Sequence, residues 1–214
     1  MPPCRNLTIE ECARMYRSFD GKHKLRNQCL HIFCLTTGLR IHEALSVKVS
    51  DVIQGGKVLQ AITMQRGSMK QATCGRVILL PVQTRAAIAR QLEWLLQHGH
   101  LGPDQFLFRS QKGNQAITRA EAWNIFNDAA RAAGLSKDRG SLGTHCWRKT
   151  FATEIFCAAI DRVQAGERID PMREVARALG HADMKNTEKY LPVDQGAALK
   201  NMQVLEARHS YALP

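Results

Sequence analysis

The 214-residue sequence contains no apolar run that approaches the roughly 20 residues of a membrane-spanning helix. Its first residues, Met1-Pro2-Pro3-Cys4-Arg5, also lack the apolar stretch of a secretory signal. We therefore expect a protein without membrane spans that works in the cytoplasm.

The cysteines lack the spacing of a disulfide framework or a structural zinc site. There are seven, an odd number, and no two of them form a CxxC pair. We expect most of them to be small buried hydrophobic residues. They are Cys4, Cys12, Cys29, Cys34, Cys74, Cys146 and Cys157.

Acidic residues are scarce relative to basic ones. Nineteen Asp and Glu stand against 30 Lys and Arg, which leaves a formal net charge of +11. Such a charge attracts polyanions and gives sequence-independent affinity for nucleic acid. A basic surface that only aids solubility fits the same numbers, so charge alone leaves both interpretations open.

Internal repeats, low-complexity tracts and linkers are also missing, which predicts a single domain over residues 1–214. Capping boxes predict helix starts at Thr8 and Thr118, and Asp170-Pro171 predicts another. Apolar spacing and helix-stopping glycines predict helices at roughly 9–19, 25–37, 40–45, 84–98, 118–133, 145–160, 171–179 and 195–207.

Two segments have the pattern of strands. Val58–Ile62 and Arg76–Leu80 flank a hairpin-like loop, and Asp51–Gly56 is predicted to be a turn region. Thr84 is predicted to cap the helix that follows, and we expect Ile160–Pro171 to be a surface loop. The expected fold class is α+β, mainly helical, with a small antiparallel sheet. The helix after Thr84 is expected to bury one apolar face, formed by Ile88, Leu92, Leu95 and Leu96.

Two arginines, two histidines and a tyrosine occur in three short motifs. They are Arg40 after Thr37-Gly38-Leu39, His145 and Arg148 in Thr144-His145-Cys146-Trp147-Arg148, and His181 after Leu179-Gly180 with Tyr190 nine positions later. These side chains suit the attack of a phenolate on a phosphodiester. Arginine neutralises the non-bridging oxygens, while other groups move protons from the attacker and to the leaving oxygen.

Taken singly, each of these residues has a simpler explanation. An isolated arginine is usually a surface charge, and an isolated histidine such as His181 is usually structural. Five suitable residues in the right order favour the catalytic interpretation.

The three motifs resemble those of the tyrosine recombinases, the phage integrase family. Thr37–Leu45 is similar to the first arginine box of that family, with His42 where a small polar residue is commoner. Residues 144–153 are similar to the second box, with Trp147 in place of the usual leucine. Residues 179–190 match the third box and its histidine-to-tyrosine interval.

The resemblance implies a role for each residue. Tyr190 would attack the scissile phosphate and form a 3′-phosphotyrosyl enzyme with a free 5′-hydroxyl. Arg40, Arg148 and His181 would bind the phosphate oxygens, and His145 would help to take the tyrosine proton. No metal or other cofactor is implied.

The proton donor of the family is a lysine in a β-hairpin, for which Lys70 is the best candidate. Arg66 also lies in this loop, but arginine hardly deprotonates at neutral pH. Lys70 could instead be a loop charge that contacts the DNA backbone. Glu43, one turn after Arg40, could hold that arginine in place or be a solvated helix residue.

The resemblance also implies partners: double-stranded DNA, and further protomers in a tetrameric synapse. Residues 193–207 resemble a C-terminal helix that docks into a neighbouring protomer, although its apolar residues could equally pack in cis. The DNA-clamping domain that precedes the catalytic one in most relatives is expected to be absent, which predicts weak, salt-sensitive DNA binding. A type IB topoisomerase and a catalytically silent DNA-binding accessory protein are the alternative functions.

Overall fold

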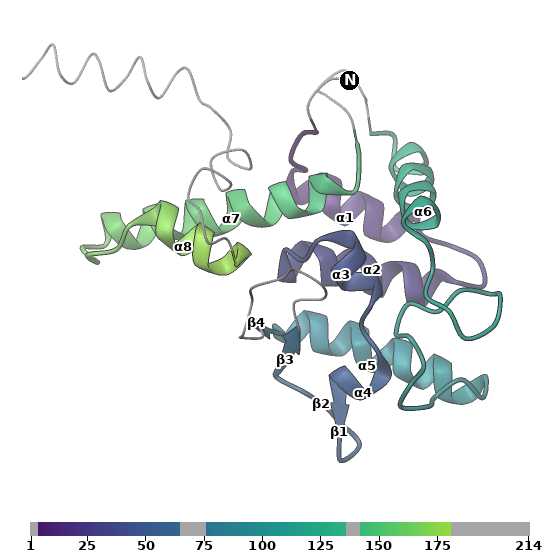
Figure 1. Cartoon of the computed structure of the whole chain (residues 1–214). Helices are drawn as coiled ribbons and strands as arrows, with labels where there is room; N and C mark the ends of the chain where they lie inside the picture. Colours follow the sequence, from purple (N-terminus) through teal and green to yellow (C-terminus); the bar gives the residue numbers. More distant parts are fainter. Residues whose placement is uncertain (1–3, 65–75, 136–141, 181–214) are drawn as a thin grey trace, which may run out of the picture.

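The computed structural model describes residues 4–64, 76–135 and 142–180 (Figure 1). Its helices are α1 (Ile9–Ser18), α2 (Lys24–Thr37), α3 (Ile41–Leu45), α4 (Val49–Val52), α5 (Val82–Gln97), α6 (Arg119–Ala132), α7 (His145–Gln164) and α8 (Pro171–Leu179). Its strands are β1 (Ile53–Gln54), β2 (Lys57–Val58), β3 (Ala61–Met64) and β4 (Arg76–Leu79). The fold is mainly helical with small antiparallel sheets, as the sequence predicts.

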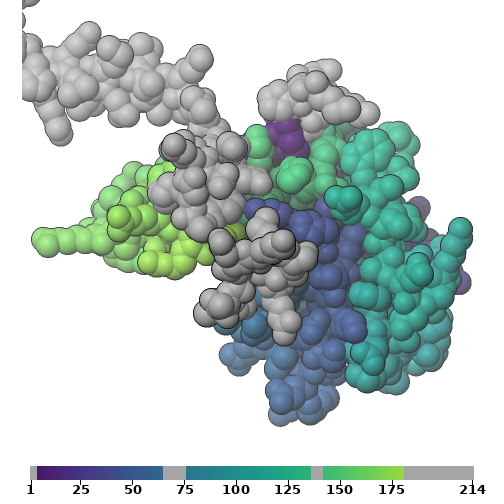
Figure 2. Space-filling view, viewed as in Figure 1, coloured from purple at the N-terminus to yellow at the C-terminus, as the bar shows by residue number. Residues whose placement is uncertain are grey.

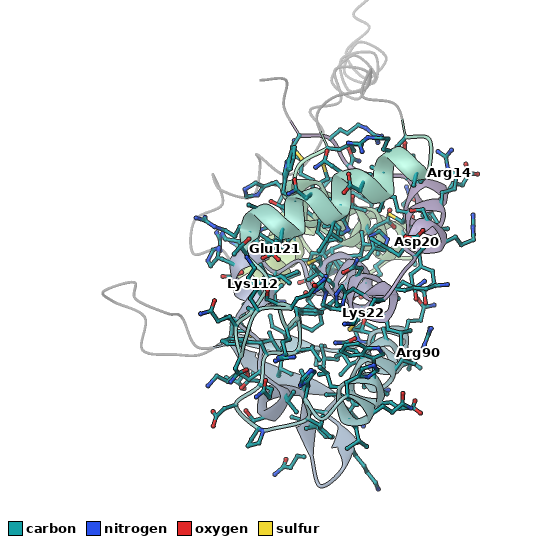
Figure 3. The ribbon with its side chains drawn as sticks, turned by 90° about the vertical axis from the view of Figure 1, so that its right-hand side faces the viewer. Arg14, Asp20, Lys22, Arg90, Lys112 and Glu121 are labelled. Atoms are coloured by element: carbon teal, nitrogen blue, oxygen red, sulfur yellow. The ribbon has the colours of Figure 1, made fainter. Side chains whose placement is uncertain are left out.

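The predicted helix starts are confirmed at three places. Thr8 and Thr118 each accept the backbone N–H of the glutamate three residues on, and each glutamate accepts the N–H of its threonine. Glu121, which closes the second of these capping boxes, lies at the start of α6 in Figure 3. Asp170 caps α8 through the N–H groups of Met172 and Arg173. These bonds satisfy backbone donors that a helix start leaves unpaired.

The strand predictions are correct in part. β3 and β4 form the expected hairpin, with Ala61 opposite Leu79 and Met64 opposite Arg76. The predicted strand at Val58–Ile62 is wrong as one element, because Val58 pairs with β1 while Ala61 and Ile62 belong to β3. The predicted turn region at Asp51–Gly56 contains the end of α4, strand β1 and the tight turn to β2.

Two helix predictions need correction. Helix α5 begins after Pro81, and the predicted cap Thr84 is buried inside it, its hydroxyl 2.7 Å from the hydroxyl of Thr36. Leu96 is 62% exposed, so the apolar face of α5 does not include it. Helix α7 extends to Gln164, which shortens the loop predicted at Ile160–Pro171.

Apolar side chains form one large core and one small cluster. The large core joins α1, α2, α5, α6 and the start of α7. The small cluster, between α7 and α8, is built on Ala152, Val175 and Leu179. Figures 1 and 2 show α7 and α8 extending side by side beyond the main body. Helix α7 is therefore the element that connects the two packed regions.

The cysteine prediction holds for half of the described cysteines. Cys29, Cys34 and Cys146 are buried, Cys4 and Cys12 are half-buried, and Cys157 is exposed. Cys74 lies outside the described residues. The thiols of Cys4 and Cys146 lie 2.6 Å apart, which places the start of the described chain against the start of α7.

A buried histidine anchors the start of α7 to the large core. The indole N–H of Trp147 donates to Nδ1 of His31 at 2.9 Å, and Nε2 of His31 lies 3.0 Å from the carbonyl of Cys12. His31 is therefore neutral, with its proton on Nε2. Burial is the largest cause that lowers its pKa from 6.5 to about 4, against the raising effect of the Cys12 carbonyl.

This lowered pKa predicts a loss of stability in mild acid. Unfolded His31 binds a proton below its usual pKa of 6.5, whereas the folded protein excludes that proton until about 4. The contribution of His31 to the free energy of unfolding is therefore complete above pH 6.5. It is lost as the pH falls, by about 2 kcal/mol between pH 8 and pH 5.

Urea unfolding at a series of pH values measures this loss. His31→Gln keeps an acceptor for Trp147 but does not titrate, so it serves as the control. We expect the wild type to lose about 2 kcal/mol more than His31→Gln over this range. Equal losses would show that His31 is not the titrating group.

Candidate functional site

Three of the six predicted site residues are described, and they lie close together. Arg40 is the N-cap residue of α3, while His145 and Arg148 lie in the first turn of α7. They are close enough that, after burial, the positive charges of Arg148 and Arg40 lower the pKa of His145. Residues more than a hundred positions apart in the sequence thus meet at one site.

Arg40 is available to a ligand from solution. Its side chain is 40% exposed, and its guanidinium lies 3.4 Å from a carboxylate oxygen of Glu43. The stronger link is between the backbone N–H of Arg40 and the other oxygen of Glu43, at 2.7 Å. Glu43 therefore holds Arg40 chiefly through the backbone, and leaves most of the guanidinium fork open.

Arg148 is buried, and two backbone carbonyls orient its guanidinium. One Nη donates to the carbonyl of Gly38, where the first motif leaves α2. The other donates to the carbonyl of Leu179 at 3.0 Å, at the end of α8. A single side chain from the second motif thus connects the turns of the first and third motifs.

Gly38 meets two requirements in the first of these turns. Its φ is +59°, a conformation that L-residues rarely adopt. A Cβ there would also collide with the ring of Phe151, one turn beyond Arg148 on α7. Glycine therefore lets α2 end directly against α7, which brings the Gly38 carbonyl within reach of Arg148.

His145 has the properties of a proton acceptor. Its side chain is exposed, yet the atoms packed around the ring make partial burial the largest cause of its lowered pKa. After Arg148 and Arg40, the charges of His42 and Lys149 lower the pKa further. An accessible imidazole that is neutral at pH 7 can accept a proton from a bound hydroxyl group.

The same charges make the site a receptor for an anion. Arg40, Arg148 and Lys149 all act on His145 with positive charge. The exposed guanidinium of Arg40 is a planar donor of the kind that binds phosphate oxygens in pairs.

Arg76 contacts the end of α8, an interaction that the sequence did not reveal. The sequence only marks it as the first residue of a predicted strand. In the structure its guanidinium donates to the carbonyls of Ala178 and Leu179 at the end of α8. The one available signal was the predicted helix end at Gly180, since basic side chains often pair with the last carbonyls of a helix.

The other predicted residues, Lys70, His181 and Tyr190, lie outside the described residues. So does the predicted helix at 195–207. Within the described part of the chain, no group of three or more His, Cys, Asp or Glu side chains is placed to hold a metal ion. None of the helices found there has the length and apolarity to cross a membrane.

Comparison with known sequences places the whole site within one matched region. Residues 5–196 match the family model described as the phage integrase family. Tyrosine recombinase XerD of Mycobacterium leprae (strain TN) is 27% identical over 199 residues, which cover 87% of this chain and 56% of that protein. The chain thus spans little more than half the length of this relative. The probable integrase/recombinase YoeC of Bacillus subtilis (strain 168) is 28% identical over 193 residues, 90% of each chain.

Solved structures share the fold. XerA recombinase superposes with a TM-score of 0.68 at 20% identity, over 99% of this chain and 68% of that one. XerH recombinase, bound to a palindromic difH substrate in a post-cleavage complex, gives a TM-score of 0.67 at 24% identity. That match covers 96% of this chain and 54% of the XerH chain.

Proposed function

We propose, from the premise that the chain belongs to the phage integrase family, that it is a site-specific DNA recombinase. It would cleave and rejoin DNA through a 3′-phosphotyrosyl intermediate, with residues 1–214 acting as one catalytic domain. The observation that carries this proposal is the convergence of Arg40, His145 and Arg148 from two distant motifs.

In the proposed cleavage step, the phenolic oxygen of Tyr190 attacks the scissile phosphorus. A tyrosyl O–P bond forms as the bond from phosphorus to the 5′-oxygen breaks. Arg40, Arg148 and His181 bind the non-bridging oxygens, whose charge must be neutralised as the transition state forms. His145 accepts the phenolic proton, and its lowered pKa leaves it unprotonated and ready for this role.

We assign the proton for the departing 5′-oxygen to Lys70. Arg66 hardly deprotonates at neutral pH, and the guanidinium of Arg76, at the start of β4, donates to carbonyls at the end of α8. Rejoining reverses the same steps, with a 5′-hydroxyl attacking the phosphotyrosine and Tyr190 leaving. The phosphodiester energy is kept in the covalent bond, so the scheme uses only protein side chains.

The proposed partners are double-stranded DNA and further copies of the chain. A net charge of +11 favours binding to the phosphate backbone at any sequence. The related XerH was solved bound to its difH substrate. We propose by analogy that protomers assemble on DNA as a tetrameric synapse, which would place the protein at the nucleoid in the cytoplasm.

Covalent trapping tests the proposed activity. A duplex with a nick beside the scissile phosphate loses a short 5′-hydroxyl fragment after cleavage, so the enzyme cannot rejoin the strand. Because the recognition site depends on the sequence and deformability of DNA, the duplexes should be drawn from the DNA that flanks the gene. We expect the wild type to form a protein–DNA adduct that resists denaturation.

Tyr190→Phe is the matched control, because it removes only the attacking oxygen. We expect no adduct with this variant and DNA affinity within about threefold of the wild type. Absence of an adduct with the wild type on the flanking sites would contradict the proposal and favour an accessory DNA-binding role. Relaxation of supercoiled plasmid without exchange between sites would instead indicate a topoisomerase.

A further inference from the structure

Two arginine side chains meet at the carboxyl end of α8. Arg76, the first residue of β4, donates to the carbonyl of Leu179 at 2.9 Å and also to that of Ala178. Arg148 donates to the same Leu179 oxygen at 3.0 Å. The last carbonyls of a helix lack partners within the helix and carry negative partial charge, so they attract cationic donors.

Arg76 is held both through its backbone and through its side chain. Its backbone pairs with Met64 in the β3–β4 hairpin, which lies beside α8 in Figure 1. Its side chain crosses the face of Gly180, where a Cβ would lie 2.6 Å from Cδ of Arg76. Gly180 ends α8 with φ of +65°, so glycine allows both the turn and the close approach of Arg76.

The shared oxygen makes the orientation of Arg148 depend on Arg76. Two of the bonds that hold the guanidinium of Arg148 run in opposite directions, one toward Gly38 and one toward Leu179. The Gly38 carbonyl is fixed by the packing of its turn on Phe151. The Leu179 carbonyl belongs to the last turn of a helix, where backbone hydrogen bonds fray most easily. Arg76 holds this turn against the hairpin.

We propose that Arg76 is a positioning residue for Arg148. By fixing the end of α8, it keeps the Leu179 carbonyl where the guanidinium of Arg148 must be held to face the scissile phosphate. This inference rests on the proposed recombinase function. The proposed role of Arg76 differs from a purely structural one. Loss of Arg76 impairs the neutralisation of phosphate charge more than it impairs folding or DNA binding.

Cleavage of two matched substrates tests the inference. One duplex carries the ordinary scissile phosphodiester, and the other carries a methylphosphonate, in which a methyl group replaces one charged oxygen. Single-turnover rates are measured at saturating DNA for the wild type, Arg76→Met and Arg76→Lys. Arg177→Met is the control. Arg177 is 78% exposed on α8, and its substitution removes the same charge as Arg76→Met.

On the phosphodiester we expect Arg76→Met to be about 10- to 100-fold slower than the wild type, since misplacement of about 1 Å costs this much. On the methylphosphonate the difference should shrink to less than about threefold, because less charge remains to be neutralised. Arg76→Lys should recover part of the rate, since an ammonium reaches one carbonyl at a time. Arg177→Met should cleave both substrates at the wild-type rate.

Equal losses on the two substrates would overturn the inference and leave Arg76 a structural cap, as would a wild-type rate for Arg76→Met. Side-chain NMR of Arg148 gives a readout that does not require activity. Arg76→Met should remove the separate, slowly exchanging Nη signals that a guanidinium held at both ends gives. Unchanged signals would also overturn the inference. A wild type that cleaves neither substrate would instead contradict the proposed function.

Discussion

Replacement of Arg148 by alanine should slow strand cleavage by roughly 1,000-fold while DNA affinity falls by less than roughly tenfold. The two effects separate because affinity is the sum of many phosphate contacts, favoured by the net charge of +11. Transition-state stabilisation depends on one guanidinium, which two carbonyls hold in a fixed direction. Cleavage on a nicked duplex and binding at matched salt concentration measure the two quantities.

Two further variants separate charge from geometry. Arg148→Lys keeps the positive charge, but an ammonium cannot reach the carbonyls of both Gly38 and Leu179 as a fork does. We expect its cleavage rate to lie between those of the wild type and Arg148→Ala. Arg131→Ala removes an arginine that is 77% exposed on α6 and should cleave normally. Near-normal cleavage by Arg148→Ala would show that another residue neutralises the phosphate.

Thermal unfolding must accompany these assays, because Arg148 is buried. Its loss removes the side-chain donor to the Gly38 carbonyl and one of the two arginine donors to the Leu179 carbonyl, at a cost of about 1–3 kcal/mol for a buried group left unpaired. A folded Arg148→Ala protein at the assay temperature makes the cleavage result interpretable. If Arg148→Ala unfolds at a lower temperature than the wild type, cleavage should be measured well below the unfolding midpoint of the variant.

The sequence predicted what local rules determine. Thr8, Thr118 and Asp170 start helices because their side chains accept nearby N–H groups, and this interaction spans only three residues. Gly38 and Gly180 end helices because glycine readily adopts positive φ. The motifs also led us to expect Arg40, His145 and Arg148 in one place, and the charges of the two arginines do act on His145. Their catalytic roles stay predictions.

What the sequence missed depends on packing between distant segments. Threonine often caps helices, yet Thr84 is buried against Thr36 of α2. The residue at the cap position of α5 is Pro81. The strand predicted at Val58–Ile62 is divided because Val58 and Ala61 have different partners. Arg76 could be assigned to the end of α8 only once the hairpin and α8 were placed side by side.

Replacement of Trp147 by leucine, the residue usual in the family, should lower the free energy of unfolding by about 3–5 kcal/mol. Trp147 is 1% exposed, and its ring stacks on Phe126 with centroids 3.8 Å apart. Leucine would leave a cavity beside Phe126 and would remove the donor to Nδ1 of His31. Urea unfolding at pH 8, where His31 is neutral in both states, measures the change.

A double-mutant cycle with His31→Leu separates the hydrogen bond from the packing. Each single variant leaves one partner of this bond unpaired, either Nδ1 of His31 or the indole N–H of Trp147, whereas the double variant removes both. The loss of the bond from His31 to the Cys12 carbonyl is common to His31→Leu and the double variant and cancels in the cycle. The combined loss should therefore be smaller than the sum of the single losses by about 1–3 kcal/mol. Leu95→Ala, in the core on α5, should instead add to Trp147→Leu within about 0.5 kcal/mol. Additive losses for His31 and Trp147 would mean that packing alone anchors the start of α7, and that the residues before Arg148 are held without this bond.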